Sequence, residues 1–277
     1  MTGHAPDRLE MRILSLNTWG GRVGDPLITW LGQADADVFC LQEMIHTPAA
    51  SSAWLTYRDD GIVLPQRANL FGEVSAALPA HRAFFCAAAR GPLYEGERVL
   101  QSEWGLATFV RRTFPIIAQA QDFVHGTFAA DGFGPHPRSR NAHAVRLFDD
   151  GTGAPVTIAH MHGLRELTGK TDTPARHAQA KAFVELILRI ARKGERLVVC
   201  GDFNVLPDSV TLEALQAIGL TDLVTGGGHT DTRTSLYTKS GRYANYMLVN
   251  EAVKVRRFEV VREPEVSDHR ALLLEIA

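Results

Sequence analysis

The sequence has few cysteines and no long apolar run. Its three cysteines, Cys40, Cys86 and Cys200, are scattered and form no CxxC pair. An odd, scattered set argues against a disulfide scaffold and favours a reducing compartment. No stretch reaches the roughly 18 apolar residues of a membrane span, and residues 1–10 contain no apolar signal segment. We therefore expect a cytoplasmic protein with no membrane span.

A strong excess of positive charge is also missing. The formal net charge is -2, so no global basic field attracts nucleic acid. A nucleic-acid substrate stays open, because arginines can still form a local basic patch. The candidates are Arg111, Arg112, Arg138 and Arg140.

The length of 277 residues and the hydrophobic fraction of 45% fit one large two-sheet α/β unit with a full core. No repeat, low-complexity tract or shift in composition marks a domain boundary. We therefore expect a flexible N-terminus over residues 1–10 and a single domain over 11–277, with a monomer favoured.

Apolar runs bounded by turn residues predict many strands and few long helices. The expected strands cover 11–16, 37–41, 82–89, 105–111, 116–124, 144–148 and 156–160, with others near residues 197, 244, 253 and 271. The expected helices cover 25–34, capped by Asp25, then 68–78, 209–218, and a long one from Pro174 to about residue 192, capped by Asp172 or Thr173. Residues 130–141 are expected to form a loop.

Polar residues recur where these apolar runs end. Asn17, Glu43, His162 and the pair Asp202 and Asn204 each follow a run, and Asp268 and His269 come just before the last one. Ligands collect at strand ends in α/β sheets, so we expect these side chains to share one site.

The residue types suit metal-assisted hydrolysis of a phosphate ester. Glu43 is a hard oxygen ligand of the kind Mg²⁺ prefers, and Asn17 can help to place the ion's ligands. His269 is the candidate general base for the attacking water. Asp202 would orient that water or an imidazole, while Asn204 and His162 would bind the phosphoryl oxygens.

Each residue taken alone also has a structural interpretation. Asn17 suits a turn before two glycines, and Asp268 can cap a turn. Glu43 can be a surface acid, and His162 a satisfied histidine whose neighbour His160 faces the core. The Asp202–Asn204 pair can form an Asx turn. The joint occurrence of all of them at strand ends favours the functional interpretation.

Seven segments in order resemble the endonuclease/exonuclease/phosphatase superfamily, which has the DNase I-like fold. They read LSLNTWG, VFCLQEM, WGLATFVRR, VTIAHMHG, RLVVCGDFN, YANYMLV and SDHRALLLEI, and together span nearly the whole chain. The resemblance implies a four-layer α/β sandwich of two mixed β-sheets flanked by helices, and a divalent metal, usually Mg²⁺ or Mn²⁺.

The resemblance also implies a role for each matching residue. Asn17 and Glu43 look like the metal-site pair, with Asp268 joining them. His162 looks like the phosphate-binding or acid histidine, and Asp202 and Asn204 like the loop pair. Asp268 and His269 match the terminal pair, in which His269 is the base.

Two positions depart from the family pattern. Asn245 replaces an aspartate that usually orients the terminal histidine. An amide can hold the ring of His269 but cannot stabilise its imidazolium by charge, and Asp231 is a nearby candidate for another acid. Trp19 stands where several nuclease branches carry an acid, which weakens the case for a DNA-repair nuclease.

Three functions follow as hypotheses. The first is a metal-dependent phosphodiesterase, and the second a phosphomonoesterase for a small metabolite or an inositol-type headgroup. The third is a catalytically weakened binding module, which Asn245 alone favours.

Several further positions stay open between a ligand contact and a structural role. Arg138, Arg140 and Asn141 can clasp a phosphate or lie in a solvated loop. Arg176 and Gln179 suit a salt-bridged helix face better than a ligand site. His229 follows three glycines and can touch substrate. The tryptophans Trp19, Trp54 and Trp104 suit the core better than base stacking.

Overall fold

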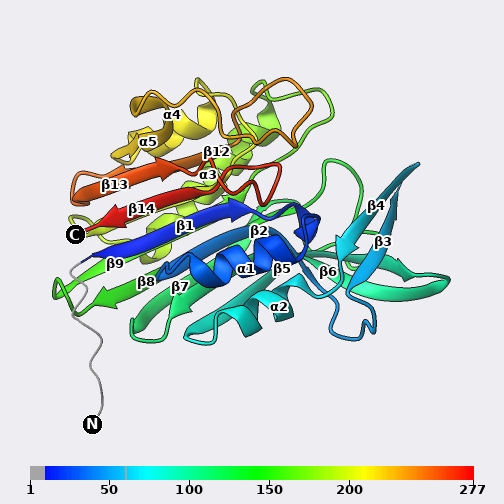
Figure 1. The fold of residues 1–277 in the computed structure, drawn as a ribbon. Helices are drawn as coiled ribbons and strands as arrows, with labels where there is room; N and C mark the ends of the chain where they lie inside the picture. The colour runs from blue at the N-terminus through cyan, green and yellow to red at the C-terminus, as the bar shows by residue number, and fades with distance from the viewer. Residues whose placement is uncertain (1–9, 60) are drawn as a thin grey trace, which may run out of the picture.

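Two β-sheets form the centre of the computed structural model, which describes residues 10–59 and 61–277. The larger sheet has eight strands in the order β13-β14-β1-β2-β6-β5-β3-β4 (Figure 1). Its strands are β1 (Met11–Asn17), β2 (Val38–His46), β3 (Trp54–Asp59), β4 (Ile62–Arg67), β5 (His81–Glu95), β6 (Arg98–Arg111), β13 (Val255–Val260) and β14 (Leu272–Ile276).

The smaller sheet has six strands in the order β11-β12-β10-β9-β8-β7. Its strands are β7 (Ile116–His125), β8 (Arg140–Asp149), β9 (Ala154–His162), β10 (Arg196–Asp202), β11 (Leu220–Asp222) and β12 (Asn245–Asn250). Both sheets mix parallel and antiparallel pairs.

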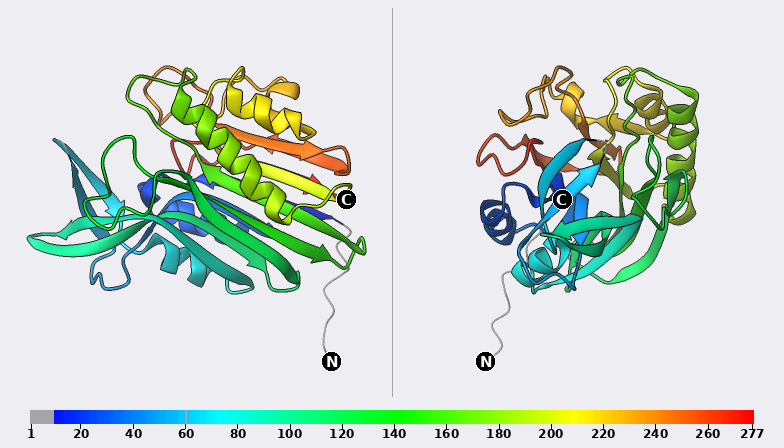
Figure 2. Two further views of the ribbon diagram at one scale, coloured as in Figure 1. Left: turned by 180° about the vertical axis from the view of Figure 1, so that it is seen from behind. Right: turned by 90° about the vertical axis from the view of Figure 1, so that its right-hand side faces the viewer.

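Helices cover the outer face of each sheet. They are α1 (Asp25–Gln33), α2 (Leu70–Ala77), α3 (Pro174–Ile190), α4 (Val210–Ala217) and α5 (Leu223–Gly226), with a short 3-10 turn η1 at Trp19–Gly21. The helices α1 and α2 lie on the larger sheet, and α3 and α4 lie on the smaller one (Figure 2). This confirms the expected four-layer sandwich.

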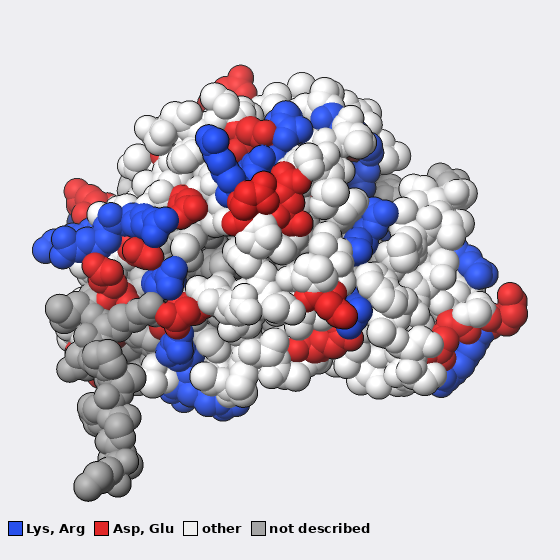
Figure 3. Space-filling model, in the orientation of Figure 1, with Lys and Arg blue, Asp and Glu red and all other residues white. Residues whose placement is uncertain are grey.

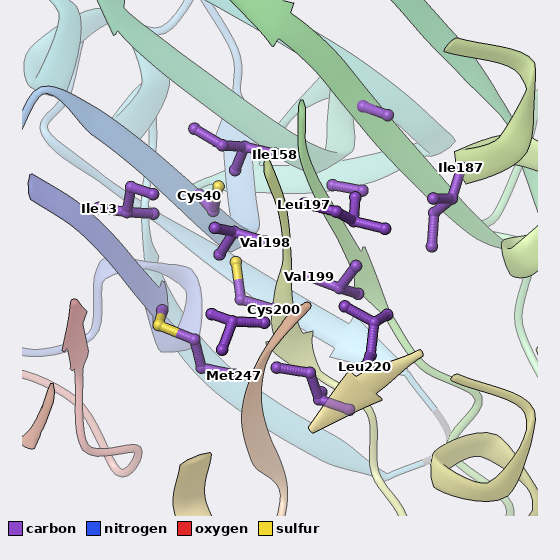
Figure 4. Packing of buried hydrophobic residues seen from close by; sticks show 14 of the residues in the cluster. Ile13, Cys40, Ile158, Ile187, Leu197, Val198, Val199, Cys200, Leu220 and Met247 are labelled. Carbon is purple, nitrogen blue, oxygen red and sulfur yellow. The ribbon is translucent and has the colours of Figure 1, made fainter. Parts of the chain in front are cut away.

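The two sheets pack face to face through alternate residues of their strands. Side chains of a strand alternate between its faces, so Ile13 of β1 shares a face with Asn17. Likewise Val198 and Cys200 of β10 share a face with Asp202. All three apolar residues are buried in one core cluster between the sheets (Figure 4). The same alternation therefore aims Asn17 and Asp202 at each other across the boundary between the sheets.

Parallel pairing brings the carboxyl ends of the site strands to one edge. The strands β1 and β2 run parallel with Asn17 opposite Gln42, and β9 and β10 run parallel with His162 opposite Asp202. The predicted site residues consequently lie at the same end of the sandwich.

The long helix α3 begins as predicted. Thr173, not Asp172, is its N-cap, because its side chain accepts a hydrogen bond from the Arg176 N–H. Pro174 occupies the first turn, where a missing N–H costs nothing. Asp172 instead accepts a hydrogen bond from the N–H of Val210.

Several sequence predictions need correction. The N-cap of α1 is Gly24, and Asp25 lies in the first turn, where it pairs with Arg67 at 2.8 Å. Strand β2 continues past Leu41 to His46, and β5 and β6 are longer than predicted. The hairpin β3–β4, the short strand β11 and helix α5 were not predicted, and the loop expected over 130–141 gives way to β8 at Arg140.

The cysteines Cys40, Cys86 and Cys200 are buried and free, as expected for a chain without a disulfide scaffold. Over residues 10–59 and 61–277, no helix is both long and apolar enough to cross a membrane. Lys, Arg, Asp and Glu side chains are interspersed over the face in Figure 3. The flexible N-terminus predicted for 1–10 falls, except for residue 10, outside the described residues.

Candidate active site

The amide of Asn17 joins the two sheets at their common edge. Its Nδ2 donates to Asp202 Oδ2 at 2.8 Å and to Glu43 Oε1 at 3.1 Å. Its Oδ1 accepts from the N–H of Trp19 at 2.9 Å, which is the turn expected for this residue. Asn17 thus serves both interpretations, because one end of the amide holds the turn and the other holds two carboxylates.

Glu43 reaches the site because its strand is irregular. The register between β2 and β6 shifts between Leu41 and Met44, and Glu43 has a positive φ of 56°. In a regular strand Glu43 would face away from the boundary to which its neighbour Gln42 points. The bulge re-aims the carboxylate toward Asn17. A non-glycine residue in this conformation costs roughly 1–3 kcal/mol and is a feature of functional sites.

The loop after β10 places Asp202 and Asn204 together. Asn204 has a φ of 55°, and its N–H donates to Asp202 Oδ1 at 3.1 Å, so the Asx turn is present. Asn204 Nδ2 donates to the carbonyl of Gly163 at 3.2 Å. A Cβ at Gly163 would lie 2.1 Å from the carbonyl oxygen of Phe203. Only glycine allows these two loops to approach so closely.

His162 faces the carboxylates. Its Nε2 lies 3.7 Å from Asp202 Oδ2 and 3.8 Å from Glu43 Oε1. Its buried Nδ1 has no hydrogen-bond partner within residues 10–59 and 61–277, and its ring packs on Trp104 with 5.3 Å between centroids. Burial lowers the pKa of His162 well below its ordinary value, with nearby arginines adding to the effect.

His160 is the histidine that lies between the sheets. Its Nδ1 is 3.2 Å from Gln42 Nε2, and its Nε2 is 2.8 Å from Thr108 Oγ1. Thr108 in turn lies 2.7 Å from Nδ1 of His143. The two neighbouring histidines therefore divide the roles, His160 in the packing and His162 at the site.

His269 is held by the unusual Asn245. Its Nδ1 donates to Asn245 Oδ1 over 2.8 Å, and its Nε2 lies 3.5 Å from Asp202 Oδ2. The Nδ2 of Asn245 donates to the carbonyls of Arg270, at 3.0 Å, and Thr232, at 3.4 Å. Carbonyls only accept hydrogen bonds, so this position is built for an amide.

Asp231, the alternative acid, does not replace the missing carboxylate. It accepts hydrogen bonds from Arg242 Nε at 2.6 Å and from the N–H of Arg233 at 2.7 Å. Its carboxylate is therefore used to hold the loop before β12.

Asp268 completes the carboxylate set. Its Oδ2 accepts from Arg233 Nη1 at 3.0 Å, while its buried Oδ1 has no hydrogen-bond partner among the described residues. Burial raises the pKa of Asp268 to about 7 against the opposing charge of Arg233. Next to it, Ser267 donates to the carbonyl of Asn17 at 2.7 Å, which fixes this loop to β1.

Sequence reasoning missed most of the positive charge at the site. Arg233 contacts both Asp268 and Nε2 of His269. Lys170 donates to the carbonyl of Tyr243, and burial lowers the pKa of its ammonium group to about 8. Both lysine and arginine lie in polar loops whose sequence carries no catalytic signal.

Among the uncertain positions, Arg140 lies at the site and its neighbours do not. Arg140 donates to the carbonyl of Gly163 at 2.9 Å and lies 5.0 Å over the ring of Trp104. Arg138 pairs with Asp59 at 2.6 Å. Asn141 donates to a backbone carbonyl of β5, so it has a packing role.

Arg176 and Gln179 bind the loop before α3. Arg176 is only 1% exposed, and it pairs with Glu166 at 3.0 Å. Gln179 Oε1 accepts from the N–H of Leu164 at 2.7 Å. The predicted salt bridge exists, but it is buried and not on an open helix face.

The aromatic candidates also divide. The ring of His229 packs on Phe258. Trp54 is 39% exposed, so its placement in the core was wrong. Trp104 lies against His162 and supports the site.

The donor set fits a magnesium-type ion. Glu43 offers a carboxylate that is 29% exposed, and burial raises its pKa. The Oδ1 of Asp268 is a second hard oxygen, which accepts no hydrogen bond from the described residues and lies 3.7 Å from His269 Nε2. Across residues 10–59 and 61–277, no three His, Cys, Asp or Glu side chains are arranged to hold an ion by themselves. Mg²⁺ suits such an incomplete set, because it keeps several waters and takes substrate oxygens as ligands.

A family model described as the endonuclease/exonuclease/phosphatase family matches residues 14–269. A family protein from Bacteroides vulgatus is 16% identical over 97% of this chain and 98% of its own, with a TM-score of 0.69. A mannosyl-6-phosphatase from Bacteroides thetaiotaomicron is 17% identical over 96% and 99%, with a TM-score of 0.66. The human Nocturnin catalytic domain with bound sulfate is 17% identical over 98% and 95%, with a TM-score of 0.63. Among curated proteins, none matches this sequence.

Proposed function

Because the chain belongs to the endonuclease/exonuclease/phosphatase family, whose members hydrolyse phosphoric esters, we propose that it is a divalent-metal-dependent hydrolase with its site at the edge of the two sheets. The observation that carries this proposal is the amide of Asn17, which holds Glu43 and Asp202 within hydrogen-bond distance. His269 stands 3.5 Å from the same Asp202 oxygen. The proposed metal ligand Glu43 and the proposed base His269 thus both lie beside Asn17 and Asp202.

His269 would act as the general base in an in-line attack by water. The hydrogen bond to Asn245 keeps the proton of the neutral ring on Nδ1, so the lone pair is on Nε2. In this structure Arg233 contacts that atom, and water would have to replace Arg233 there before it gives up its proton. Burial and the charge of Arg233 lower the pKa of His269 well below its ordinary value, so the ring is neutral at pH 7.

The remaining residues would bind and orient the phosphoryl group. Asp202 would orient the attacking water beside His269, and Asn204 and His162 would donate to the phosphoryl oxygens. Glu43, Asn17 and Asp268 would hold Mg²⁺ or Mn²⁺, which when bound polarises the phosphoryl group and stabilises the leaving oxygen.

A phosphodiester, with nucleic acid as one possibility, is the substrate that the sequence favours. A phosphomonoester is the second candidate, and the cluster of arginine and lysine at the site supports it. A weakened binding module has less support, because His269 retains a partner on Nδ1. We also propose a cytoplasmic monomer whose single domain covers 11–277, which agrees with the three free thiols.

The test is hydrolysis of bis-p-nitrophenyl phosphate and of p-nitrophenyl phosphate with Mg²⁺ or Mn²⁺. We expect His269→Ala and Asp202→Ala each to lower kcat at least about 100-fold, the lower range for general-base catalysis. Undiminished activity in both variants would refute the assigned site. If the folded wild-type protein hydrolyses neither ester, the binding-module hypothesis is favoured.

A further inference from the structure

Arg233 is a buried cation to which the proposed mechanism assigns no role. It is 5% exposed, and its Nη1 contacts Asp268 Oδ2 at 3.0 Å and also Nε2 of His269. Its Nε is buried and has no hydrogen-bond partner in the described part of the chain. A buried donor without a partner is costly, so an acceptor is expected to join it.

The side chain is held in place from several directions. Its guanidinium stacks on Tyr237 with 4.1 Å to the ring centroid. Its backbone N–H donates to Asp231 Oδ1, and its carbonyl accepts from Arg242 Nη2 at 2.9 Å. Arg233 also forms an isolated bridge with His269. Such support preorganises a binding group and reduces the entropy lost when a ligand binds.

The charges around Arg233 leave room for more than one negative charge. Three cationic side chains have contacts at the site: Arg140 donates to the carbonyl of Gly163, Lys170 to that of Tyr243, and Arg233 to Asp268. The charges of Arg22 and Arg165 also act on the pKa values of Asp268 and Glu43. These cationic side chains outnumber the carboxylates of Glu43, Asp202 and Asp268.

This excess distinguishes the two candidate substrates. A phosphomonoester carries nearly two negative charges at pH 7 and three strong acceptor oxygens, whereas each diester phosphate carries one charge. A guanidinium fork matches two phosphate oxygens at once. We infer that Arg233 binds a terminal phosphate group through its guanidinium N–H groups, so that the site selects phosphomonoesters over phosphodiesters. The inference rests on the proposed hydrolase function.

Binding the phosphate also changes the contact between Arg233 and His269, the proposed base. In the structure Arg233 contacts Nε2 of His269, the atom that must accept the proton from water. Phosphate oxygens that accept from Nη1 of Arg233 replace its contact with Nε2 of His269, while the stacking on Tyr237 and the backbone hydrogen bonds keep the side chain in place. Binding of the correct substrate thereby exposes the lone pair of the base, and a diester with fewer terminal oxygens does so less well.

The experiment compares Arg233→Ala and Arg233→Lys on the two p-nitrophenyl esters at fixed Mg²⁺. Loss of a charge-assisted hydrogen bond lowers kcat/KM for the monoester about 10- to 100-fold, and the diester loses a smaller factor. Arg233→Lys keeps the charge without the fork and falls between wild type and Arg233→Ala. Guanidinium chloride in the millimolar range partly restores the monoester rate of Arg233→Ala. The control is Arg189→Ala. This arginine is exposed on α3 and pairs with Asp122 of β7, and its loss leaves the ratio of the two rates unchanged.

Equal losses on both esters, or no loss on either, would overturn the role of Arg233. Calorimetric titration with inorganic phosphate separates this inference from the proposed function. If wild-type protein is inactive on both esters, the hydrolase proposal fails. The role of Arg233 is then tested by phosphate binding alone. A Kd for phosphate that is at least tenfold higher in Arg233→Ala supports this role, and an equal Kd refutes it. If Arg233→Ala does not fold, Arg233→Lys provides the same comparisons.

Discussion

Replacing Asn245 by aspartate places a carboxylate beside His269, the proposed general base, and its effect can be worked out from the structure. The side chain is buried, and its Oδ1 lies 2.8 Å from Nδ1 of His269. An opposite charge this close favours the imidazolium by about 1–3 pK units. We therefore expect the Asn245→Asp variant to raise the pKa of His269 by that amount. Its acid limb in the pH–rate profile moves to higher pH by the same interval.

Above that limb the variant gains rate, because the carboxylate stabilises the imidazolium that forms as water loses its proton. A gain of about tenfold in kcat corresponds to about 1.4 kcal/mol. The substitution also has a cost, since the Nδ2 of Asn245 donates to the carbonyls of Thr232 and Arg270. Carboxylate oxygens against those carbonyls lower the free energy of unfolding by about 1–3 kcal/mol.

The assay pairs an NMR titration of the His269 ring without metal with kcat measured from pH 5 to 9. Urea unfolding of the same protein measures the stability cost. The control is Asn250→Asp at the other end of β12, where aspartate keeps the hydrogen bond from Leu197 N–H but loses the one that Nδ2 donates to the Glu195 carbonyl. It should therefore show a similar stability cost and leave the His269 titration unchanged. An unchanged His269 titration in Asn245→Asp, with the fold intact, would refute the reasoning.

Three further predictions follow from the site and its support. Glu43→Gln keeps an acceptor for Asn17 Nδ2 but removes a negative charge, so calorimetry should show Mg²⁺ binding at least about tenfold weaker. The control Glu185→Gln, at an exposed position of α3, should bind Mg²⁺ as wild type does. Gly163→Ala places a Cβ 2.1 Å from the backbone carbonyl oxygen of Phe203, so the unfolding free energy should fall by about 1–3 kcal/mol, and activity should fall with it. In the control Gly226→Ala the new Cβ meets no atom of the described residues within 4 Å. An equal loss of stability in both variants would contradict the steric explanation. Burial lowers the pKa of His143 to about 4, so only the unfolded chain takes up this proton as pH falls below about 6.5. The contribution of His143 to the unfolding free energy should then fall by about 1.6 kcal/mol between pH 6.5 and 5. Because Asp268, with its raised pKa, changes stability in the opposite direction, the contribution is measured as the difference between wild type and His143→Asn in urea titrations. The same pH dependence in both proteins would contradict it.

The sequence predicts well where a continuous apolar run ends in a polar residue. From Ile13 to Asn17 both faces of β1 are buried, so the run itself indicates a central strand and its last residue marks the strand end. Parallel pairing then brings Asn17, Asp202 and His162 to one edge, so strand ends alone were enough to find them.

Two parts of the molecule could not be predicted, for different physical reasons. The hairpin β3–β4 is at the edge of the larger sheet, and most of its residues are exposed or half-buried on both faces. It therefore lacks the alternation that identifies a strand. Arg233 contacts Asp268 and His269, which lie 35 and 36 residues away in sequence. Only the folded chain brings these charges together.

The amide of Asn17 has one further consequence for how activity reports on folding. It hydrogen-bonds residues of both sheets, from the last position of a strand that pairs with β2 on one side and β14 on the other. A slip of β1 by a single position would turn the amide to the opposite surface of the strand and separate the two acids it connects. Molecules in which β1 has slipped would show no turnover, so the specific activity would measure only the fraction of molecules with β1 in the correct register.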